Sequence, residues 1–380
     1  MTTSKVTIDP RLHDAVIFNV PQSDSVSLLT EKLRGAGVTT AAADARGPRE
    51  AARRLGTRAE RSVVVEASPD GITAARDGGF SLVIGVVPGG DATELLDRGA
   101  DAVIEDVAAV DVRTGDSRMS EIPNALESYL ALIDTLAGRI PVVCLDYDGT
   151  LSAIVPDPDS ARLVDGADAT LARLVQRCPV AILSGRDLAD IRERVAVPGL
   201  WYAGSHGFES IAPGGGYRQN DEAAAAVPVL ERAAEELRER LANVAGSRVE
   251  HKRFAVAVHY RDTDTNHIGE VVAATHRVGR REGLRVTNGR KVVELRPDVD
   301  WNKGTTLAWI RDQIGGPGPA IYIGDDLTDE DAFDAVRADG IGIVVRHTED
   351  GDRPSAARFT LDDPEQVREF LDRLADDLPT

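Results

Sequence analysis

The amino-acid sequence predicts an α/β protein whose main body is a doubly wound, Rossmann-like parallel sheet. Three short apolar runs each end abruptly in a polar cluster; they cover residues 141–145, 180–183 and 320–323. Continuous apolar runs of this length are typical of strands that are buried on both faces of a parallel sheet. Segments with a helical pattern lie between or after the runs, at residues 167–177, 188–194 and 303–313. This alternation indicates a doubly wound sheet, whose chemistry sits beyond the carboxyl ends of the strands.

The pattern changes between the second and third runs, which predicts an inserted α+β domain. Residues 208–219 have the pattern of a hairpin around a Gly-rich turn, and the Asn288-Gly289 turn signal joins two more strand-like stretches. Helical patterns at about 229–244 and 268–282 accompany these hairpins. A β-rich segment with two helices is too self-contained to be a loop, so we expect it to form a domain of its own.

The first third of the chain predicts a further small α/β domain. Its apolar runs cover residues 14–18, 62–65 and 81–86, and helix-like segments separate them. A length of 380 residues suits two or three domains. The expected boundaries are 1–135 for the N-terminal domain, 138–202 with 297–380 for the core, and 203–296 for the inserted domain.

Composition limits the macromolecular partners and the cellular compartment that we expect for this protein. The formal net charge of −19 argues against nucleic acid or an anionic membrane as a partner of the whole molecule. The two cysteines, Cys144 and Cys178, exclude a disulfide scaffold and suit a reducing compartment. No apolar run reaches 18 residues and the first residues carry no signal-peptide core, so we expect a cytoplasmic protein. No feature of the sequence indicates an oligomeric state.

Carboxylates gather where two of the predicted strands end. Asp146 and Asp148 follow the first run two residues apart, a spacing that places both on one side of an extended chain. Two carboxylates that share a site repel each other, and a bound divalent cation relieves the repulsion. Asp325 and Asp326 follow the third run and would lie at the same sheet edge. Together these residues predict an all-oxygen Mg²⁺ site.

The remaining polar clusters point to a phosphate. Mg²⁺ that is held by a few carboxylates commonly takes substrate phosphate as a further ligand. Lys303 supplies a cation at a helix start, and Ser184 supplies a hydroxyl at a strand end. Any single aspartate could instead cap a loop or helix. Four clusters that all stand at ends of strands or helices favour a phosphate-handling site.

These clusters resemble the four motifs of the haloacid dehalogenase superfamily of phosphotransferases. The matching residues are Asp146-Tyr-Asp-Gly-Thr150, Leu183-Ser-Gly185, Lys303 and Gly324-Asp-Asp-Leu-Thr-Asp329. The inserted domain is similar to the superfamily's type IIB cap. Further motifs resemble the trehalose-6-phosphate phosphatase family of mycobacterial type: Leu183-Ser-Gly-Arg186, Gly204-Ser-His-Gly207, His259-Tyr-Arg261, Glu294-Leu-Arg-Pro297 and Gly324-Asp-Asp-Leu-Thr-Asp-Glu330. The resemblance covers about residues 138–380.

The resemblance implies a mechanism. Asp146 would attack phosphorus and form an aspartyl-phosphate, while Asp148 would act first as an acid and then as a base. Mg²⁺ would be bound by Asp146, the backbone carbonyl of Asp148 and Asp325. Ser184, Lys303 and the backbone around Gly149 would hold the transferring group. Asp326 and Asp329 would orient Lys303 and metal-bound water, or would instead cap a helix.

Substrate choice is expected to belong to the inserted domain and its surroundings. The residues expected to bind substrate are Asp146, Tyr147, Asp148, Gly149, Arg186, His206, Lys291 and Glu294. A lone charged residue on a strand could equally be a solvated side chain. The linkers at about 199–205 and 297–302 are marked by Gly or Pro and are expected to act as hinges. The three tryptophans, Trp201, Trp301 and Trp309, are expected in the core rather than against a sugar.

The activity that the resemblance implies is Mg²⁺-dependent hydrolysis of trehalose 6-phosphate to trehalose and phosphate. One alternative is a phosphatase of another sugar phosphate, such as sucrose 6-phosphate or a mannosyl phosphate. A second alternative is a sugar phosphomutase, because mutases and phosphatases share the aspartate chemistry.

The N-terminal domain resembles the same superfamily without its reactive groups. Residues 14–21 resemble the first motif, but Asn19 and Pro21 stand where the two aspartates belong. Residues 65–80 resemble the fourth motif, with Ala67 in the place of a metal ligand. We expect a degenerate, catalytically inactive copy, with an unrelated α/β domain as the alternative.

Overall fold

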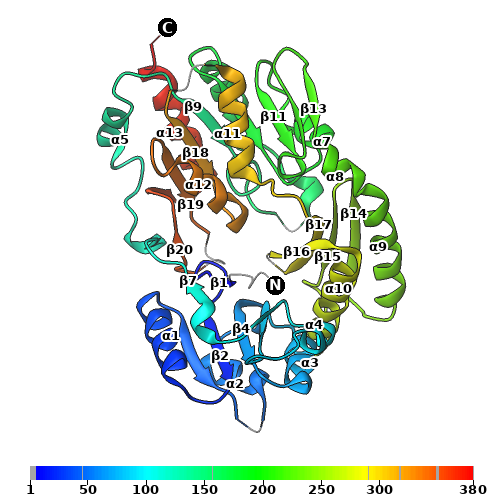
Figure 1. The fold of residues 1–380 in the computed structure, drawn as a ribbon. Helices are drawn as coiled ribbons and strands as arrows, with labels where there is room; N and C mark the ends of the chain where they lie inside the picture. Colours follow the sequence, from blue (N-terminus) through cyan, green and yellow to red (C-terminus); the bar gives the residue numbers. More distant parts are fainter. Residues whose placement is uncertain are drawn as a thin grey trace. The chain divides into compact units, whose positions relative to one another are not determined.

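The structure, a computed structural model, describes residues 6–44, 46–155, 157–289, 291–315, 318–347 and 351–379. It divides into two compact units. Unit 1 comprises Met1–Thr114 and Val227–Asp298, and unit 2 comprises Gly115–Ala226 and Val299–Thr380. The predicted α/β class with parallel sheets is confirmed (Figure 1). Among the described residues, no helix is both long and apolar enough to cross a membrane.

Unit 2 is built on one eight-stranded sheet. Its six parallel strands are β9 (Val142–Leu145), β10 (Val180–Leu183), β11 (Trp201–Gly204), β18 (Ala320–Gly324), β19 (Ile341–Val345) and β21 (Phe359–Leu361). The antiparallel strands β12 (Glu209–Ile211) and β13 (Tyr217–Gln219) extend one edge. The order is β13-β12-β11-β10-β9-β18-β19-β21, so the chain reverses direction of growth between β9 and β18. This switch point is where α/β sheets bind their ligands.

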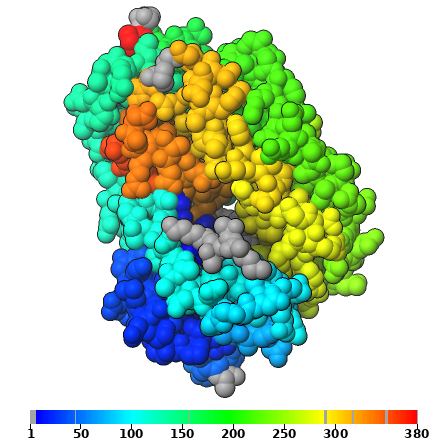
Figure 2. Space-filling model, in the orientation of Figure 1, coloured from blue at the N-terminus to red at the C-terminus, as the bar shows by residue number. Residues whose placement is uncertain are grey.

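Helices cover both faces of this sheet because its central strands are apolar on both sides. Val143 and Leu145 belong to one core cluster, and Val142 and Cys144 belong to the other. The first face carries α5 (Tyr129–Thr135), α6 (Ala167–Leu174), α7 (Leu188–Val195) and α13 (Pro364–Asp377). The second face carries α11 (Lys303–Ile314) and α12 (Glu330–Val336), which lie side by side (Figures 1 and 2). A short helix, α8 (Asp221–Ala225), and the strand pair β8 (Ser117–Arg118) and β20 (Pro354–Ser355) complete the unit.

The N-terminal part of unit 1 is a five-stranded parallel sheet in the order β3-β2-β4-β5-β6. The strands are β2 (Ala15–Asn19), β3 (Thr39–Ala42), β4 (Ser62–Glu66), β5 (Leu82–Val86) and β6 (Ala102–Ile104). The helices are α1 (Asp24–Gly35), α2 (Pro48–Leu55), α3 (Pro69–Asp77) and α4 (Thr93–Arg98). A separate parallel pair joins β1 (Val6–Ile8) to β7 (Val110–Val112).

The second part of unit 1 is a four-stranded antiparallel sheet packed against two helices. The strands, in the order β14-β15-β17-β16, are β14 (Arg248–Lys252), β15 (Ala255–His259), β16 (Leu284–Gly289) and β17 (Val292–Pro297). The helices α9 (Val227–Arg240) and α10 (Ile268–Glu282) pack against each other and against this sheet. Residues of β17 alternate between half-buried and buried, as a sheet with one covered face requires.

Three features differ from the sequence-based expectation. The hairpin at residues 208–219 pairs with β11 and joins the core sheet, so the inserted segment spans 227–298 rather than 203–296. Residues 115–135 belong to unit 2, because Tyr129 and Leu132 of α5 are buried in its core. Strand pairing continues through Gly289, opposite Val292, so the chain reverses after the Asn-Gly signal rather than at it. Local turn signals do not say which sheet a hairpin will join.

A buried polar contact joins the two parts of unit 1. Helix α10 packs against α3, and a Cβ at Gly269 would lie 2.3 Å from the carbonyl oxygen of Asp77. Arg76 of α3 is 3% exposed and donates to the carbonyls of Gly99 (3.1 Å) and Phe80 (3.0 Å). The same guanidinium is paired with Asp101 and lies 3.3 Å from Nδ1 of His276 on α10. Arg76 therefore satisfies polar groups on both sides of the contact.

We predict that Arg76→Met lowers the stability of unit 1 by roughly 2 kcal/mol, because it removes the buried guanidinium that donates to Asp101 and to the carbonyls of Gly99 and Phe80. Thermal unfolding followed by circular dichroism measures the change. The control is Arg98→Met, since Arg98 is 46% exposed and reaches only the exposed Asp70, at 3.6 Å. The control should cost less than about 1 kcal/mol. Equal effects of the two substitutions would contradict a supporting role of the Arg76 contact.

Candidate active site

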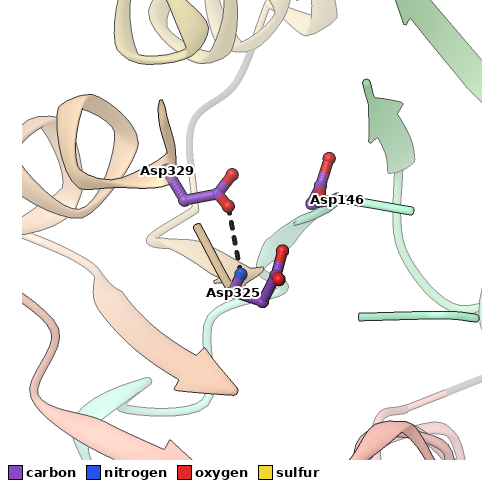
Figure 3. A group of neighbouring side chains, drawn as sticks. All are labelled: Asp146, Asp325 and Asp329. Carbon is purple, nitrogen blue, oxygen red and sulfur yellow. Dashed lines mark hydrogen bonds between the residues drawn. The ribbon is translucent and has the colours of Figure 1, made fainter. Parts of the chain in front are cut away.

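The candidate site lies at the carboxyl edge of the eight-stranded sheet, at its switch point. Strand β9 leads directly into Asp146, and β18 leads into Asp325. The two strands are paired in parallel, and the amide of Asp146 donates to the carbonyl of Ile323 at 2.9 Å. Asp146, Asp325 and Asp329 are all buried, with one carboxylate oxygen of each within 4.8 Å of the others (Figure 3). The structure thus brings together the first and fourth motifs of the sequence.

Lys303 lies among these carboxylates. It is the first residue of α11, whose start is fixed by a capping box between Asn302 and Thr305. Its Nζ donates to Oδ1 of Asp146 at 2.9 Å and to Oδ1 of Asp329 at 2.6 Å. Burial alone would lower the pKa of Lys303, but the carboxylates of Asp146 and Asp329 outweigh it and raise the pKa. Lys303 is therefore held as an ammonium in an otherwise dry setting.

Asp329 is buried and held by four hydrogen bonds. Its Oδ2 accepts hydrogen bonds from the amides of Asp325 (3.0 Å) and Asp326 (2.9 Å). Its Oδ1 accepts from Lys303 and from the hydroxyl of Tyr322. Asp326 instead caps the turn Leu327–Asp329, where its Oδ1 accepts from the amide of Leu327 at 2.7 Å. In the structure Asp329 accepts a hydrogen bond from Lys303, and Asp326 and Asp329 form the capping box of this turn.

The charge at this cluster suits a divalent cation. Burial, with Asp329 and Asp325 nearby, raises the pKa of Asp146 well above its usual value, although Lys303 opposes the shift. Three carboxylates around one ammonium repel one another when ionised, and a divalent cation would relieve this repulsion. Because four donors already occupy Asp329, the carboxylates that best fit a metal are those of Asp146 and Asp325. Hard oxygen ligands of this kind suit a divalent cation.

Gly149 allows this close approach of the two motifs. Its φ of +79° is in the left-handed region, and a Cβ there would lie 2.2 Å from Oδ2 of Asp325. His347, which follows β19, has its Nε2 3.1 Å from the carbonyl oxygen of Gly149 and 3.3 Å from Oδ2 of Asp325. Tyr147 points the other way, into the core, where its hydroxyl donates to Ala161. Tyr147 thus faces the carboxylate cluster with its backbone and not with its side chain.

Asp148 is joined to the second motif by Arg186. The guanidinium donates to both carboxylate oxygens of Asp148, each at 2.7 Å, and also to Asp190 at 3.0 Å. Asp148 remains the more open of the two motif-one aspartates, with 44% of its side chain exposed against 7% for Asp146. Ser184 is buried after β10, and its Oγ accepts from the amide of Arg186 at 3.1 Å. Ser184 and Arg186 therefore lie at the same sheet edge as Asp148.

His206 occupies a strained turn beside this edge. Its φ is +57°, and its amide donates to the carbonyl of Ser184 at 2.9 Å. A Cβ at Gly185 would lie 2.7 Å from Nε2 of His206, so only glycine fits opposite the ring. Thr306 of α11 lies against the same turn, 3.4 Å from the carbonyl oxygen of His206. His206 thus links the second motif to the helix that carries Lys303.

Two predicted substrate residues, Lys291 and Glu294, lie in unit 1. Glu294 on β17 is paired with Arg296, two residues along the same face. Lys291 is exposed between β16 and β17 with a φ of +58°. On the same sheet Glu250 accepts a hydrogen bond from Nε2 of His259 at 2.8 Å, and this hydrogen bond lowers the pKa of Glu250 to about 2. The assignment of Lys291 and Glu294 to substrate binding stays a prediction.

Sequence reasoning missed three contributors to the site. Tyr322 was part of an apolar run, and nothing local showed that its hydroxyl would reach Asp329. His347 is distant in the chain from Asp325, which it contacts. Asp190 stands four residues after Arg186, so their i,i+4 spacing was a local signal for that pair. A polar residue just after the strand β19 was the one available signal for His347, because functional groups collect at strand ends.

The site combines an aspartate after a central strand, a lysine that bridges two carboxylates, and a third carboxylate after the neighbouring strand. This arrangement is that of a phosphotransferase of the haloacid dehalogenase class. The sequence model of the family described as trehalose-phosphatase matches residues 144–365. The chain therefore belongs to the trehalose-phosphatase family. The similarity to enzymes of that family extends over almost the whole chain.

The chain is 54% identical to a trehalose-phosphate phosphatase of Mycobacterium avium, over 98% of this chain and 97% of the relative. It is also 54% identical to the trehalose-phosphate phosphatase of Mycobacterium tuberculosis, over 97% and 96%. A solved trehalose-6-phosphate phosphatase related protein is 26% identical with a TM-score of 0.54, covering 62% of this chain and 97% of its own. The C-terminal domain of the Candida albicans trehalose-6-phosphate phosphatase shares the fold, with a TM-score of 0.57 at 23% identity, covering 67% and 98%.

We predict that Gly149→Ala lowers kcat/KM by about a hundredfold or more, because the new methyl group displaces Asp325 from its place beside Asp146. Phosphate release at saturating divalent cation is the measurement. The control is Gly138→Ala, since Gly138 has a similar φ of +70° but nothing within 4 Å of a Cβ. That control carries the same backbone strain and should keep its activity. Matching losses in both variants would show that strain, and not the position of Asp325, matters.

Proposed function

We propose that this enzyme hydrolyses trehalose 6-phosphate to trehalose and phosphate. The observation that carries the chemistry is Lys303, buried between Asp146 and Asp329 beside a third carboxylate, since such a cluster suits transfer of a phosphoryl group. The choice of sugar rests on the relatives, which carry the name trehalose-phosphate phosphatase at 54% identity over nearly the whole chain. A cytoplasmic location is part of the proposal and is supported by two buried, unpaired cysteines.

Asp146 is the proposed nucleophile. Its carboxylate attacks phosphorus, the bond between phosphorus and the sugar oxygen breaks, and an aspartyl-phosphate forms on the protein. Asp148 gives its proton to the departing sugar oxygen. In the second step water attacks the aspartyl-phosphate, Asp148 takes a proton from that water, and phosphate leaves with Asp146 regenerated. Lys303, Ser184 and the backbone at Gly149 bind the oxygens of the transferring group.

The proposed cation is Mg²⁺, bound by Asp146, the backbone carbonyl of Asp148 and Asp325. When bound, it supplies positive charge that offsets the phosphate dianion and the neighbouring carboxylates. The negative cluster of Asp146, Asp325 and Asp329 supports a divalent cation in this place. Asp329 keeps Lys303 in position through its own hydrogen bonds.

Arg186 has to release Asp148 during the reaction. Both oxygens of Asp148 accept from Arg186, so neither can donate a proton to a leaving oxygen while the pair is intact. We propose that Arg186 exchanges Asp148 for the sugar phosphate as substrate binds. Tyr147 contributes its backbone, and His206 shapes the hinge and the substrate side of the core.

Sugar specificity is proposed to reside in residues 227–298, through Lys291 and Glu294. Both are charged side chains that can pair with sugar hydroxyls, and Glu294 already holds a paired arginine, Arg296, on one face of the sheet. A phosphatase of another sugar phosphate and a phosphomutase are the alternatives. These alternatives would use Asp146 and Lys303 in the same way and would differ in the sugar that binds or in the acceptor of the phosphoryl group.

The N-terminal domain is proposed to be a degenerate copy of the core. Its switch point lies between β2 and β4, where Asn19 and Glu66 are paired positions. Glu66 is 1% exposed; its oxygens accept from Asn19 (2.6 Å) and from the amides of Ala67 (2.9 Å) and Ser68 (2.8 Å). A Cβ at Gly71 would lie 2.0 Å from Glu66, so the carboxylate is packed against the first turn of α3. The arrangement supports a closed, inactive site.

We expect trehalose 6-phosphate to be the best substrate of the purified chain, by about tenfold or more in kcat/KM over the other compounds. The panel consists of trehalose 6-phosphate, sucrose 6-phosphate, mannose 1-phosphate and glucose 6-phosphate, with released phosphate as the readout. Removal of divalent cations with a chelator should abolish activity, and Mg²⁺ should restore it. A better rate with another member of the panel would overturn the sugar assignment. Conversion of one sugar phosphate to another without net phosphate release would favour the phosphomutase.

Asp146→Asn in the full chain should reduce phosphate release by about ten-thousandfold, because an amide is not a nucleophile. The wild-type protein, quenched in acid during turnover with phosphorus-labelled substrate, should carry a label that hydroxylamine removes; the variant should carry none. Asp376→Asn, an exposed change on α13, is the control and should behave as wild type. Activity of the Asp146 variant above a few per cent would contradict the covalent mechanism and an inactive N-terminal copy.

A further inference from the structure

An arginine lies between two tryptophans in unit 2. The guanidinium carbon of Arg218 is 4.5 Å from the ring centroid of Trp301 and 4.7 Å from that of Trp309. A third tryptophan, Trp201, meets Trp309 edge to face, with centroids 5.9 Å apart and planes at 86°. These are the three tryptophans of the chain, so all of its indole rings belong to this one stack.

The stack joins an edge of the core sheet to the helix that carries Lys303. Arg218 lies on β13, the outermost strand, opposite Ser210 of β12. Trp301 stands immediately before Asn302, the residue that caps α11. Trp309 lies within α11 itself. The guanidinium therefore contacts the helix through one ring just before its first turn and another further along it.

Arg218 is held by the indole faces rather than by an acid. Its Nη1 is a buried atom without a hydrogen-bond partner among the described residues, and the same holds for Nε1 of Trp301. Within the part of the chain that the structure describes, no carboxylate lies within ion-pair distance of Arg218. A planar guanidinium stacks on aromatic faces in a way that an ammonium does not. This position therefore requires both the positive charge and the planar shape of a guanidinium.

Several other contacts also hold α11, which packs beside α12 and has Thr306 3.4 Å from the carbonyl oxygen of His206. The capping box of Asn302 and Thr305 closes the first turn upon itself. Leu307 and Ile310 pack the helix on the sheet, which fixes its distance from the strands. Arg218 adds one contact just before the first turn, through Trp301, and one within the helix, through Trp309. A small rotation there would move Nζ of Lys303 away from Asp146 and Asp329, which lie 2.9 and 2.6 Å from it.

We propose that Arg218 is a positioning residue for phosphoryl transfer, which acts through Trp301 and Trp309 to hold Lys303 between Asp146 and Asp329. The proposal rests on the phosphatase function proposed above. Arg218 touches neither Lys303 nor the carboxylates, so its effect falls on the rate of the chemical step rather than on the sugar. Its removal would loosen the position of a group that must be placed to a fraction of an ångström.

The test is Arg218→Ala, with Arg218→Lys as the conservative variant. Kinetics are measured at a temperature well below the melting temperature of the variant. We expect Arg218→Ala to lower kcat by about tenfold to a hundredfold, with KM changed less than about twofold. Free guanidinium at low millimolar concentration should restore part of kcat, whereas equal sodium chloride should not. Arg218→Lys should remain impaired. Tryptophan fluorescence should shift in both variants, because all three indoles of the chain lie in the stack.

The matched control is Arg373→Ala on α13. Arg373 also lies over an aromatic ring, 5.9 Å from the centroid of Tyr129, but it is exposed and paired with Glu369. Its removal should leave kcat and the tryptophan fluorescence as in wild type. Where Arg218→Ala fails to fold, Trp301→Phe gives the same test, since the smaller ring weakens the stack without emptying it.

The outcomes separate this proposal from the proposed function. Activity is measured on para-nitrophenyl phosphate as well as on trehalose 6-phosphate, so that a wrong sugar assignment leaves the test intact. Wild-type protein inactive on every phosphate ester would overturn the proposed function. Active wild type with an unchanged kcat in Arg218→Ala would overturn the positioning role alone. A fall in melting temperature without a fall in kcat would also overturn it, because it would show a purely structural contact.

Discussion

The ammonium of Lys303, buried among three carboxylates, is the interaction on which the rest of the core depends. A lysine that is 3% exposed is stable only because Asp146 and Asp329 accept its protons at short range. Asp146 follows the strand β9, Asp329 lies in the turn before α12, and Lys303 begins α11, after the inserted segment in the chain. The eight-stranded sheet, the capping box of α11 and the glycines at 149 and 324 all keep these three elements within contact distance.

Much of this arrangement could be predicted from residues alone. The apolar runs before Asp146, Ser184 and Asp325 matched β9, β10 and β18, because buried parallel strands leave a plain pattern in the sequence. That the clusters meet at one edge followed from the common direction of those strands. The pairing of the hairpin at 208–219 with β11 did not follow, since a hairpin's own sequence specifies its turn but not its neighbour.

Other parts of the site were beyond sequence reasoning for a physical reason. In the sequence Tyr322 is one more residue of an apolar strand. In the structure its hydroxyl donates a hydrogen bond to Asp329. Asp148 was expected to be available as an acid, yet the structure pairs both of its oxygens with Arg186. Such pairings depend on which rotamers meet across loops far apart in the chain. Local pattern contains no information on them.

Gly269 makes the stability of α10 depend on the N-terminal domain. A glycine inside α10 weakens that helix, and it is used here to admit the backbone of Asp77 from the N-terminal domain. A chain shortened by its N-terminal domain would keep the weakened helix and lose the contact that compensates for it. The inserted segment therefore depends on the N-terminal domain for part of its stability.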